Sequence, residues 1–241
     1  MTGTLLENLN FVAGETTVTG VSSKILSDFL KWRVVMCGRY TLETSPRQIA
    51  EFFELLREPP WEPRNNICPT QQVLGIDLDR DGHRQSRLFQ WGLIPSWAKD
   101  PRLGSKMINA RGETVAEKPS FRAAFKRRRC LIPADGFYEW KAVPGQKKKQ
   151  PYHIHFRDAT LMAFAGLWEH WSSSDGSEVE SCTIITTEAN SQMAFLHDRM
   201  PVILEPGDYA LWLDPDSRPD ELKRLLHPLN FAELELVPRF P

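Results

Sequence analysis

Cys37 follows a methionine directly, within the stretch Met36–Tyr40 (MCGRY). If the peptide bond before it is broken, this cysteine carries an α-amine and a thiol on adjacent carbons, and both groups titrate within about two units of neutral pH. An aldehyde that meets the pair forms an imine with the amine, and the thiol then closes a thiazolidine ring. Only an N-terminal cysteine offers this geometry. The alternative is a small buried cysteine, which Arg39 disfavours because a guanidinium must reach solvent or an anion.

Three further stretches set a polar or charged residue among small or aromatic ones: residues 108–114 (INARGET), 134–140 (ADGFYEW) and 197–201 (HDRMP). Glu139, between two aromatic residues, is suited to general acid or base work if it is desolvated, whereas an outward glutamate on a strand would do no chemistry. His197 can donate a hydrogen bond or move a proton near neutral pH, with Asp198 placed to orient its ring. Asn109 offers an amide that donates and accepts. The alternative for His197 is a histidine at a helix end or in a turn, and the alternative for Asn109 is a turn asparagine.

Together with residues 91–97 (WGLIPSW), these stretches resemble the SRAP family, the SOS response-associated peptidase-like proteins that process abasic sites in DNA. The resemblance runs in order from Met36 to about Leu204. It implies that Cys37 links covalently to the aldehyde of the lesion, while Glu139 protonates the ring oxygen as the sugar opens and shuttles protons during imine formation. It also implies that Asn109 orients the cysteine amine or holds the opened sugar, and that His197 donates to the sugar hydroxyl or phosphate.

Three arginines flank these candidates, and guanidinium groups suit phosphates. We expect Arg39, Arg111 and Arg199 to form a local basic groove, because the formal net charge of -1 gives no global basic field. Trp97 offers a face for an unpaired base, a contact worth roughly 1–3 kcal/mol, although a tryptophan of this kind also suits a core. Single-stranded DNA containing abasic sites is the expected partner, since a lesion there needs no extrusion from a duplex.

The elements that must position these residues are mostly strands. Ser45-Pro46 predicts a helix start, and residues 73–91 predict a hairpin with Asp81-Gly82 at its turn. A late helix is expected near Asp216, with Pro219 in its first turn. Further strands are predicted at 130–141, 151–157, 161–168 and 179–187. The sum is an α+β fold: a β-rich single domain with an antiparallel, barrel-like sheet and peripheral helices.

Residues 1–35 differ in character from the rest of the chain, and a short helix is predicted within them from Ser22 or Ser23 to Leu30. The whole segment is interpreted as an N-terminal extension that is not part of the mature protein. Residues 36–241 are interpreted as the SRAP domain, shortened at a C-terminus that could lack the family's closing strand. Three accounts of the leader compete. Met36 is the true start, which we favour; or Cys37 removes the leader by attacking the Met36 carbonyl; or the leader stays and no aminothiol forms.

Composition bears on the compartment, on membrane insertion and on cofactors. The chain has four cysteines in no C-x-x-C arrangement, which argues against a disulfide framework and fits a reducing compartment, so a cytoplasmic protein, nucleoid-associated when bound to DNA, is expected. No run of about eighteen apolar residues predicts a membrane helix, and no glycine-rich phosphate loop implies a nucleotide cofactor. His153 and His155 share one strand face but lack further ligands at useful spacing, so no metal is predicted. A monomer is expected.

Two basic runs remain, residues 126–129 and 147–149. Either could be a solvated face. For the lysine run this reading is favoured, because Pro144, Gly145 and Gln146 before it are typical of a hairpin tip.

Three functions compete on these observations. A DNA repair protein would crosslink to abasic sites through N-terminal Cys37, with some lyase activity by β-elimination from the imine. A conventional thiol hydrolase would use Cys37 as nucleophile, His197 as base and Asn109 as orienter, and would tolerate a blocked N-terminus. A non-catalytic single-strand binding module would bind salt-sensitively and ignore the lesion. The first is preferred, with the other two in that order.

Overall fold

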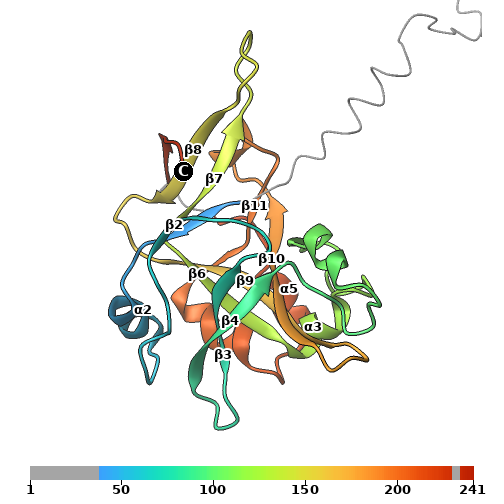
Figure 1. The fold of residues 1–241 in the computed structure, drawn as a ribbon. Coiled ribbons are helices and arrows are strands. Elements are labelled where there is room, and N and C mark those ends of the chain that lie inside the picture. The colour runs from blue at the N-terminus through green and yellow to red at the C-terminus, as the bar shows by residue number, and fades with distance from the viewer. Residues whose placement is uncertain (1–37, 230–233) are drawn as a thin grey trace, which may run out of the picture. The chain divides into compact units, whose positions relative to one another are not determined.

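Strands dominate the computed structural model of the chain, with short helices at the periphery (Figure 1). The structure describes residues 38–229 and 234–241. Cys37 and the helix predicted near Ser22 to Leu30 lie outside these residues. The described residues belong to one compact unit, Met36–Pro241.

Five strands close into a barrel. β3 pairs with β4 and β6, β6 pairs with β9, and β9 pairs with β10, all antiparallel. A parallel pairing of β10 with β4, through Ser181↔Gln90 and Cys182↔Trp91, completes the ring. Closure removes the free sheet edges that would otherwise need protection. The strands are β3 (Gln72–Leu78), β4 (Arg84–Trp91), β6 (Arg129–Ala134), β9 (Met162–Ser172) and β10 (Glu178–Glu188).

A second sheet of five strands has the order β13-β8-β7-β1-β2. Tyr40 of β1 meets Trp91 and Phe164 edge-on at centroid distances of 5.4 Å and 6.0 Å. Phe137 of β7 reaches Phe164 in the same way, so this sheet packs one face onto the barrel. The strands are β1 (Tyr40–Leu42), β2 (Arg64–Ile67), β7 (Gly136–Lys141), β8 (Gln150–Phe156) and β13 (Leu234–Pro238).

Short strands and helices surround these sheets. β5 and β11 add to β10, and β12 adds to β9. The short strands are β5 (Asn109–Arg111), β11 (Arg199–Pro201) and β12 (Ile203–Leu204). The helices are α2 (Pro46–Phe53), η1 (Pro101–Lys106), α3 (Arg122–Arg127), η2 (Met193–Phe195), η3 (Pro206–Asp208), α4 (Tyr209–Leu213) and α5 (Pro219–Arg224). None of the helices in the described ranges is long and apolar enough to cross a membrane.

Local signals place several elements as the sequence predicts. Ser45 caps α2 through a reciprocal hydrogen-bonded box with Gln48, and Pro46 occupies the first turn. Gly82 adopts φ +83° at the β3–β4 turn, a conformation that glycine reaches without strain. Pro219 begins α5. The β-rich α+β fold with a barrel-like sheet is confirmed, and its mainly antiparallel pairing is interrupted only where β10 meets β4 and β5 among the described strands.

The strand predicted over residues 130–141 is two strands in two different sheets. They part at Asp135, whose carboxylate accepts hydrogen bonds from the Thr44 hydroxyl and from the backbone N–H groups of Glu43 and Thr44. Its own N–H donates to the Thr41 carbonyl. Asp135 thus pins the crossover from β6 to β7, which carries Glu139 away from the barrel wall and into the second sheet.

Candidate functional site

The carboxyl end of β10 brings two of the sequence motifs together. β5 lies parallel to β10, with Asn109 opposite Ile184 and Arg111 opposite Thr186. β11 lies antiparallel to β10, with Arg199 opposite Glu188. Asn109 is partly buried and Arg111 is exposed. The stretches 108–114 and 197–201, distant in sequence, therefore share one strand end.

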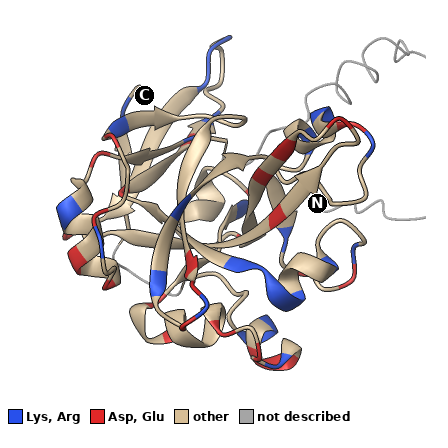
Figure 2. Ribbon diagram, turned by 60° about the horizontal axis from the view of Figure 1, so that its bottom comes forward, with Lys and Arg blue, Asp and Glu red and all other residues tan. Residues whose placement is uncertain are grey.

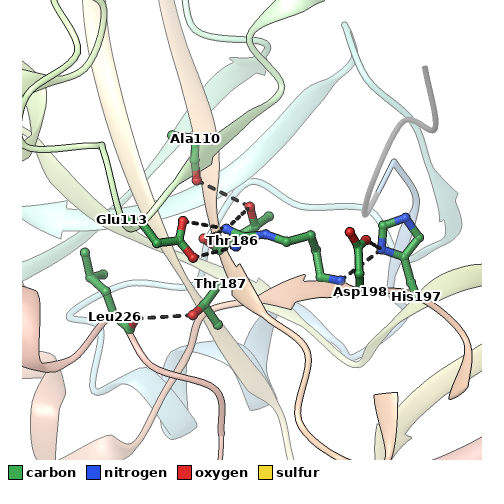
Figure 3. Close-up of polar contacts among 8 residues, drawn as sticks. Ala110, Glu113, Thr186, Thr187, His197, Asp198 and Leu226 are labelled. Carbon is green, nitrogen blue, oxygen red and sulfur yellow. Dashed lines mark hydrogen bonds and ion pairs between the residues drawn. The ribbon is translucent and has the colours of Figure 1, made fainter. Parts of the chain in front are cut away.

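Arg199 is committed to contacts inside the protein, and Figure 3 labels two of its partners, Glu113 and Thr186. Its guanidinium forms a two-pronged ion pair with Glu113, with Nη2 2.9 Å from Oε2, and also donates to the Thr186 carbonyl at 2.7 Å. The side chain is only 11% exposed. Hydrogen bonding from Arg199 is the main cause that holds the pKa of Glu113 below its usual range. Arg199 therefore ties β11 to the turn after β5, and its charge is largely matched.

His197 precedes this tie and has two contacts at one ring nitrogen. Nδ1 accepts a hydrogen bond from the Arg199 N–H at 3.0 Å and lies 2.9 Å from an Asp198 carboxylate oxygen (Figure 3). In the neutral ring, acceptance at Nδ1 places the proton on Nε2, which is then a donor. In the charged ring, Nδ1–H faces Asp198 instead. The His197 side chain is 10% exposed, whereas the Asp198 side chain is 86% exposed.

Glu139 lies on β7 opposite Tyr152 of β8 and is 2% exposed. Because side chains alternate along a strand, it shares a face with Phe137, which packs toward the barrel. Tyr152 in turn meets Phe195 edge-on at a centroid distance of 5.7 Å. Phe195 precedes His197 by two residues, so this aromatic contact brings the Glu139 strand beside the His197 segment.

Arg39 points to the opposite face of the second sheet. The Tyr138 N–H donates to the Arg39 carbonyl, which places Arg39 beside Tyr138 rather than beside Glu139. Its guanidinium lies 5.6 Å from the Trp140 ring centroid and 3.4 Å from the Asn66 side-chain oxygen. The structure thus brings Arg111 and Arg199 to the β10 end and sets Arg39 on another surface.

Trp97 is exposed at the rim of a pocket. A loop anchors it: Ile94 and Ala98 pack against Trp171, whose Nε1 donates to the Ala98 carbonyl at 2.7 Å. Trp97 itself is 59% exposed. The adjoining pocket, of about 730 Å³, is lined by Trp97, Ala98, Lys99, Asp100, Arg102, Leu103, Ser105 and Lys106. This aromatic face is therefore open to a ligand and not part of the core.

A family model described as SOS response associated peptidase (SRAP) matches residues 36–238. The chain belongs to the SRAP family. It is 46% identical over 204 residues to the abasic site processing protein YoqW of Bacillus subtilis, covering 83% of this chain and 90% of that protein. It is 40% identical over 195 residues to the abasic site processing protein HMCES of Xenopus tropicalis, covering 70% of this chain and 57% of that protein.

Solved structures of similar proteins share the SRAP architecture. A crystal structure of a protein from Bacteroides thetaiotaomicron superposes with a TM-score of 0.76 at 26% identity, covering 83% of this chain and 90% of that chain. One from Bordetella bronchiseptica gives a TM-score of 0.75 at 25% identity, covering 85% and 100%. The barrel and its second sheet are thus the frame on which the motif residues sit.

The other cysteines of this SRAP domain are placed apart from such chemistry. Cys130 and Cys182 are fully buried in the barrel, and burial raises the thiol pKa of both. Cys68 is partly exposed and lies 3.5 Å from the Asn66 side-chain oxygen. A deprotonated thiolate is the reactive form, so the barrel cysteines are poor nucleophiles.

Potential metal ligands gather at one place in the described residues, at Asp79, Asp81 and His83 on the β3–β4 turn. There Asp79 accepts backbone N–H groups from Asp81 and His83, which is ordinary turn chemistry. His153 and His155 are used otherwise: His153 bonds the Thr41 hydroxyl and His155 bonds the Phe156 carbonyl.

Sequence reasoning missed three contributors to the site. Glu113 lies inside the stretch 108–114, so its motif pointed to it, but its partner Arg199 is 86 residues away. Tyr152 and Phe195 carry no local signal, because their contact depends on how β8 meets η2.

Proposed function

We propose that this protein processes abasic sites in single-stranded DNA by forming a covalent thiazolidine link through Cys37. The observation that carries the proposal is the meeting of Asn109 and Arg111 with the His197 segment at the end of β10, beside the strand that carries the buried Glu139. The curated relatives with the same domain are named abasic site processing proteins, which supports the same substrate class here.

The proposed reaction balances as a condensation. The Cys37 amine adds to the aldehyde carbon of the opened deoxyribose, and loss of one water gives an imine. The thiol sulfur then bonds to the imine carbon while the thiol proton moves to nitrogen, closing the five-membered ring. Slow ring closure leaves the imine open to β-elimination, which breaks the 3′ carbon–oxygen bond and nicks the strand. A lyase side reaction is therefore part of the proposal.

Glu139 is proposed as the proton carrier for these steps. Its near-complete burial keeps bulk water from competing for the proton it transfers. Gly38, bonded directly to Cys37 in sequence, is also buried, and the residue after it pairs with Tyr138 next to Glu139. This adjacency supports a role for Glu139 in opening the sugar ring and in imine formation.

His197 is proposed as a donor to the sugar or phosphate of the lesion. Nδ1 is occupied as an acceptor, so the neutral ring has a proton to give at Nε2. The same geometry weighs against the thiol-hydrolase alternative, because a general base needs a free lone pair at the nitrogen facing the thiol. Asn109 is proposed to hold the cysteine amine or the opened sugar.

Binding of the strand is proposed to use Arg111 and Trp97. Arg111 is exposed and forms no ion pair within the described residues, so its guanidinium is able to meet a phosphate. The half-exposed Trp97 ring, with Lys99 and Lys106 near it, suits stacking of an unpaired base. Arg199 positions β11. Arg39 is proposed to contact DNA only where the nucleic acid passes over the sheet face that carries Trp140.

Release of the Cys37 amine is the remaining requirement. We propose that translation from Met36 with methionine removal, or an acyl shift of the Met36 carbonyl onto the Cys37 thiol followed by hydrolysis, exposes it. The second route is the autoproteolytic capacity that the family description suggests, and a role in the DNA damage and SOS response goes with it.

A denaturing gel tests the proposal. The full chain and a chain begun at Met36 are incubated with a single-stranded oligonucleotide containing one abasic site, and intact mass reports the N-terminus of each. Chains that begin at Cys37 are expected to give a heat-stable adduct. The mass of the adduct should equal protein plus DNA minus one water.

The matched control is Cys68→Ala, which removes a partly exposed thiol elsewhere. Cys37→Ala should abolish the adduct, and Cys68→Ala should leave it intact. An equal yield of the same adduct from Cys37→Ala defeats the assignment, and peptide cleavage by a chain with a blocked N-terminus would favour the thiol hydrolase.

A further inference from the structure

The hairpin of β7 and β8 projects from the body of the domain (Figure 1). Its last paired residues are Lys141 and Gln150, and the connection between them contains Lys147, Lys148 and Lys149. Residues 140–157 contain no Asp or Glu. The projecting tip is accordingly basic (Figure 2), although the chain as a whole has a net charge of -1.

The lysines of this hairpin are not used to hold the fold. Lys147, Lys148 and Lys149 are exposed, and none of them forms an ion pair with another residue in the described ranges. A projecting hairpin gives up the entropy of several side chains and gains little packing in return. Free ammonium groups on such an extension are available to a polyanion.

At the root of the hairpin the basic surface meets an aromatic one. The Lys141 ammonium lies over one face of the Phe195 ring, 3.5 Å from its centroid, and Phe195 and Tyr152 meet in a T-shaped contact. Phe195 remains 49% exposed. An aromatic ring next to a lysine presents a base with a stacking face and a phosphate with a cation.

Phe195 and Tyr152 form an aromatic platform, and the turn that carries Phe195 is held in place by the core. Phe195 ends η2, whose first residue, Met193, is fully buried. Asn190 holds this turn from both sides, because its side-chain oxygen accepts the Met193 N–H and its nitrogen donates to the Leu229 carbonyl. An exposed phenylalanine on a fixed turn loses little freedom when a base stacks on it.

The platform is continuous with the candidate site. Lys141 follows Glu139 by two residues on the same strand face, and Tyr152 lies opposite Glu139. His197 follows Phe195 by two residues. A DNA strand whose abasic site lies between Glu139 and His197 would therefore leave the candidate site across Phe195. It would then continue along the β7–β8 hairpin, which reaches roughly 10 Å past Lys141.

We propose that Phe195, Tyr152 and Lys141 form a stacking subsite for a nucleotide that flanks the abasic site, and that Lys147, Lys148 and Lys149 bind the phosphates of the same flank. This inference rests on the proposed function for the identity of the strand. It assigns one flank of the DNA to the hairpin, so binding depends on the length of that flank and not of the other.

Fluorescence anisotropy with the full chain tests this. The probes are single-stranded oligonucleotides with a tetrahydrofuran abasic analogue, which has no aldehyde and forms no covalent link. In one set of probes the 5′ flank is extended to about ten nucleotides and the 3′ flank is kept at about four, and in the other set the lengths are reversed. The wild-type chain is expected to gain about tenfold or more in affinity from extension of one flank only.

Two variants separate the parts of the subsite. The triple variant K147Q/K148Q/K149Q should lose the flank dependence and lower the slope of log affinity against log salt by about 2, at about 0.7 per phosphate on a single strand. Phe195→Ala should weaken binding about tenfold and leave that slope unchanged. Thermal unfolding confirms that each variant folds.

The matched control R80Q/R122Q/K126Q removes the same charge from the β3–β4 turn and α3, which lie away from the hairpin in Figure 1. Equal effects of the control and the hairpin variant overturn the hairpin assignment, and unchanged binding by Phe195→Ala overturns the stacking subsite. Adduct yield on natural abasic DNA is scored separately. If the chain forms no adduct but its binding still depends on one flank, the proposed function is defeated and the hairpin assignment stands.

Discussion

Residues 126–129 and residues 147–149 carry similar runs of positive charge, but the fold treats them in opposite ways. In the first run Arg129 is 3% exposed, Arg128 pairs with Glu169 at 2.7 Å, and Arg127 lies 3.6 Å from Asp216. In the second run the three lysines are exposed and without ion pairs in the described residues. A basic stretch in a sequence is thus either structural or available, and burial decides which.

Arg129 shows what the first run is for. Its guanidinium donates to the carbonyls of Phe125 and Lys126 in α3 and to those of Trp212 and Asp214 at the end of α4. Burial is the main cause that lowers its pKa to about 10. The cation remains charged at neutral pH and closes two helix ends whose carbonyls would otherwise lack donors.

The substitution Arg129→Met is therefore expected to lower the free energy of unfolding more than any other change considered. The replacement leaves four carbonyls without their donor, and we expect a loss of about 3 kcal/mol in the free energy of unfolding. Urea denaturation followed by circular dichroism measures it. Lys126→Met, on an exposed neighbour, is the control and should change stability by less than about 0.5 kcal/mol. Equal stabilities for the two variants would show that Arg129 is not structural.

The next effect concerns the pair of Arg128 and Glu169. The Glu169 side chain is 7% exposed, so Arg128→Gln leaves a buried carboxylate without its charged partner. We expect a loss of about 2 kcal/mol at neutral pH. The double variant with Glu169→Gln should recover part of it, and a double-mutant cycle in urea measures the coupling. A cycle with no coupling would place Arg128 among the available charges instead.

An effect of similar size, expected only in acid, appears as a pH dependence at the root of the hairpin. His153 Nε2 lies within hydrogen-bond distance of the Thr41 hydroxyl, at 3.1 Å, and burial, with the charges of His155 and Arg239, lowers the His153 pKa to about 4 from 6.5. Between these values the unfolded chain binds a proton that the folded chain excludes, so stability falls as the pH drops from about 6.5 to 4.

His153→Asn removes this titration. The wild-type chain should lose on the order of 2 kcal/mol more than the variant between pH 7 and pH 4, as measured by urea midpoints at each pH. Parallel loss in both chains would mean that other groups, and not His153, set the acid sensitivity of the second sheet.

The smallest expected effect on stability belongs to the second run. K147Q/K148Q/K149Q should change the free energy of unfolding by less than about 0.5 kcal/mol, because exposed lysines without partners contribute little. The same variant is the one expected to lose DNA affinity. A variant that lost stability but kept its affinity would reverse the comparison.

Local chemistry explains which elements the sequence predicted. The Ser45-Pro46 start and the Asp81-Gly82 turn depend on residues within a few positions, so they could be placed without tertiary information. The break at Asp135 could not, since it depends on partners at residues 43 and 44, which are 91 and more positions away. The parallel closure of β10 onto β4 likewise has no local signal.

The candidate site divides in the same way. The motifs gave the residue types. The fold brings the Asn109 and His197 stretches to β10 and sets Glu139 on β7, and their joint action stays a proposal. The arginines were less predictable: Arg199 is matched by Glu113, and pleating turns Arg39 to the other face. Cys37 lies outside the described residues, so its part in the site stays a proposal.

Closure of the barrel has a consequence for the timing of folding. The pairing of β10 with β4 joins Cys182 to Trp91, and the tie between Arg199 and Glu113 spans 86 residues. Contacts so distant in sequence make folding slow, because loop entropy is lost before they form. On a ribosome, residues 38–42 emerge long before β10 and β11 exist. In the proposed function, the cysteine in front of the domain therefore has to wait for β10 and β11, because a half-made chain has not yet assembled the centre that the proposal needs.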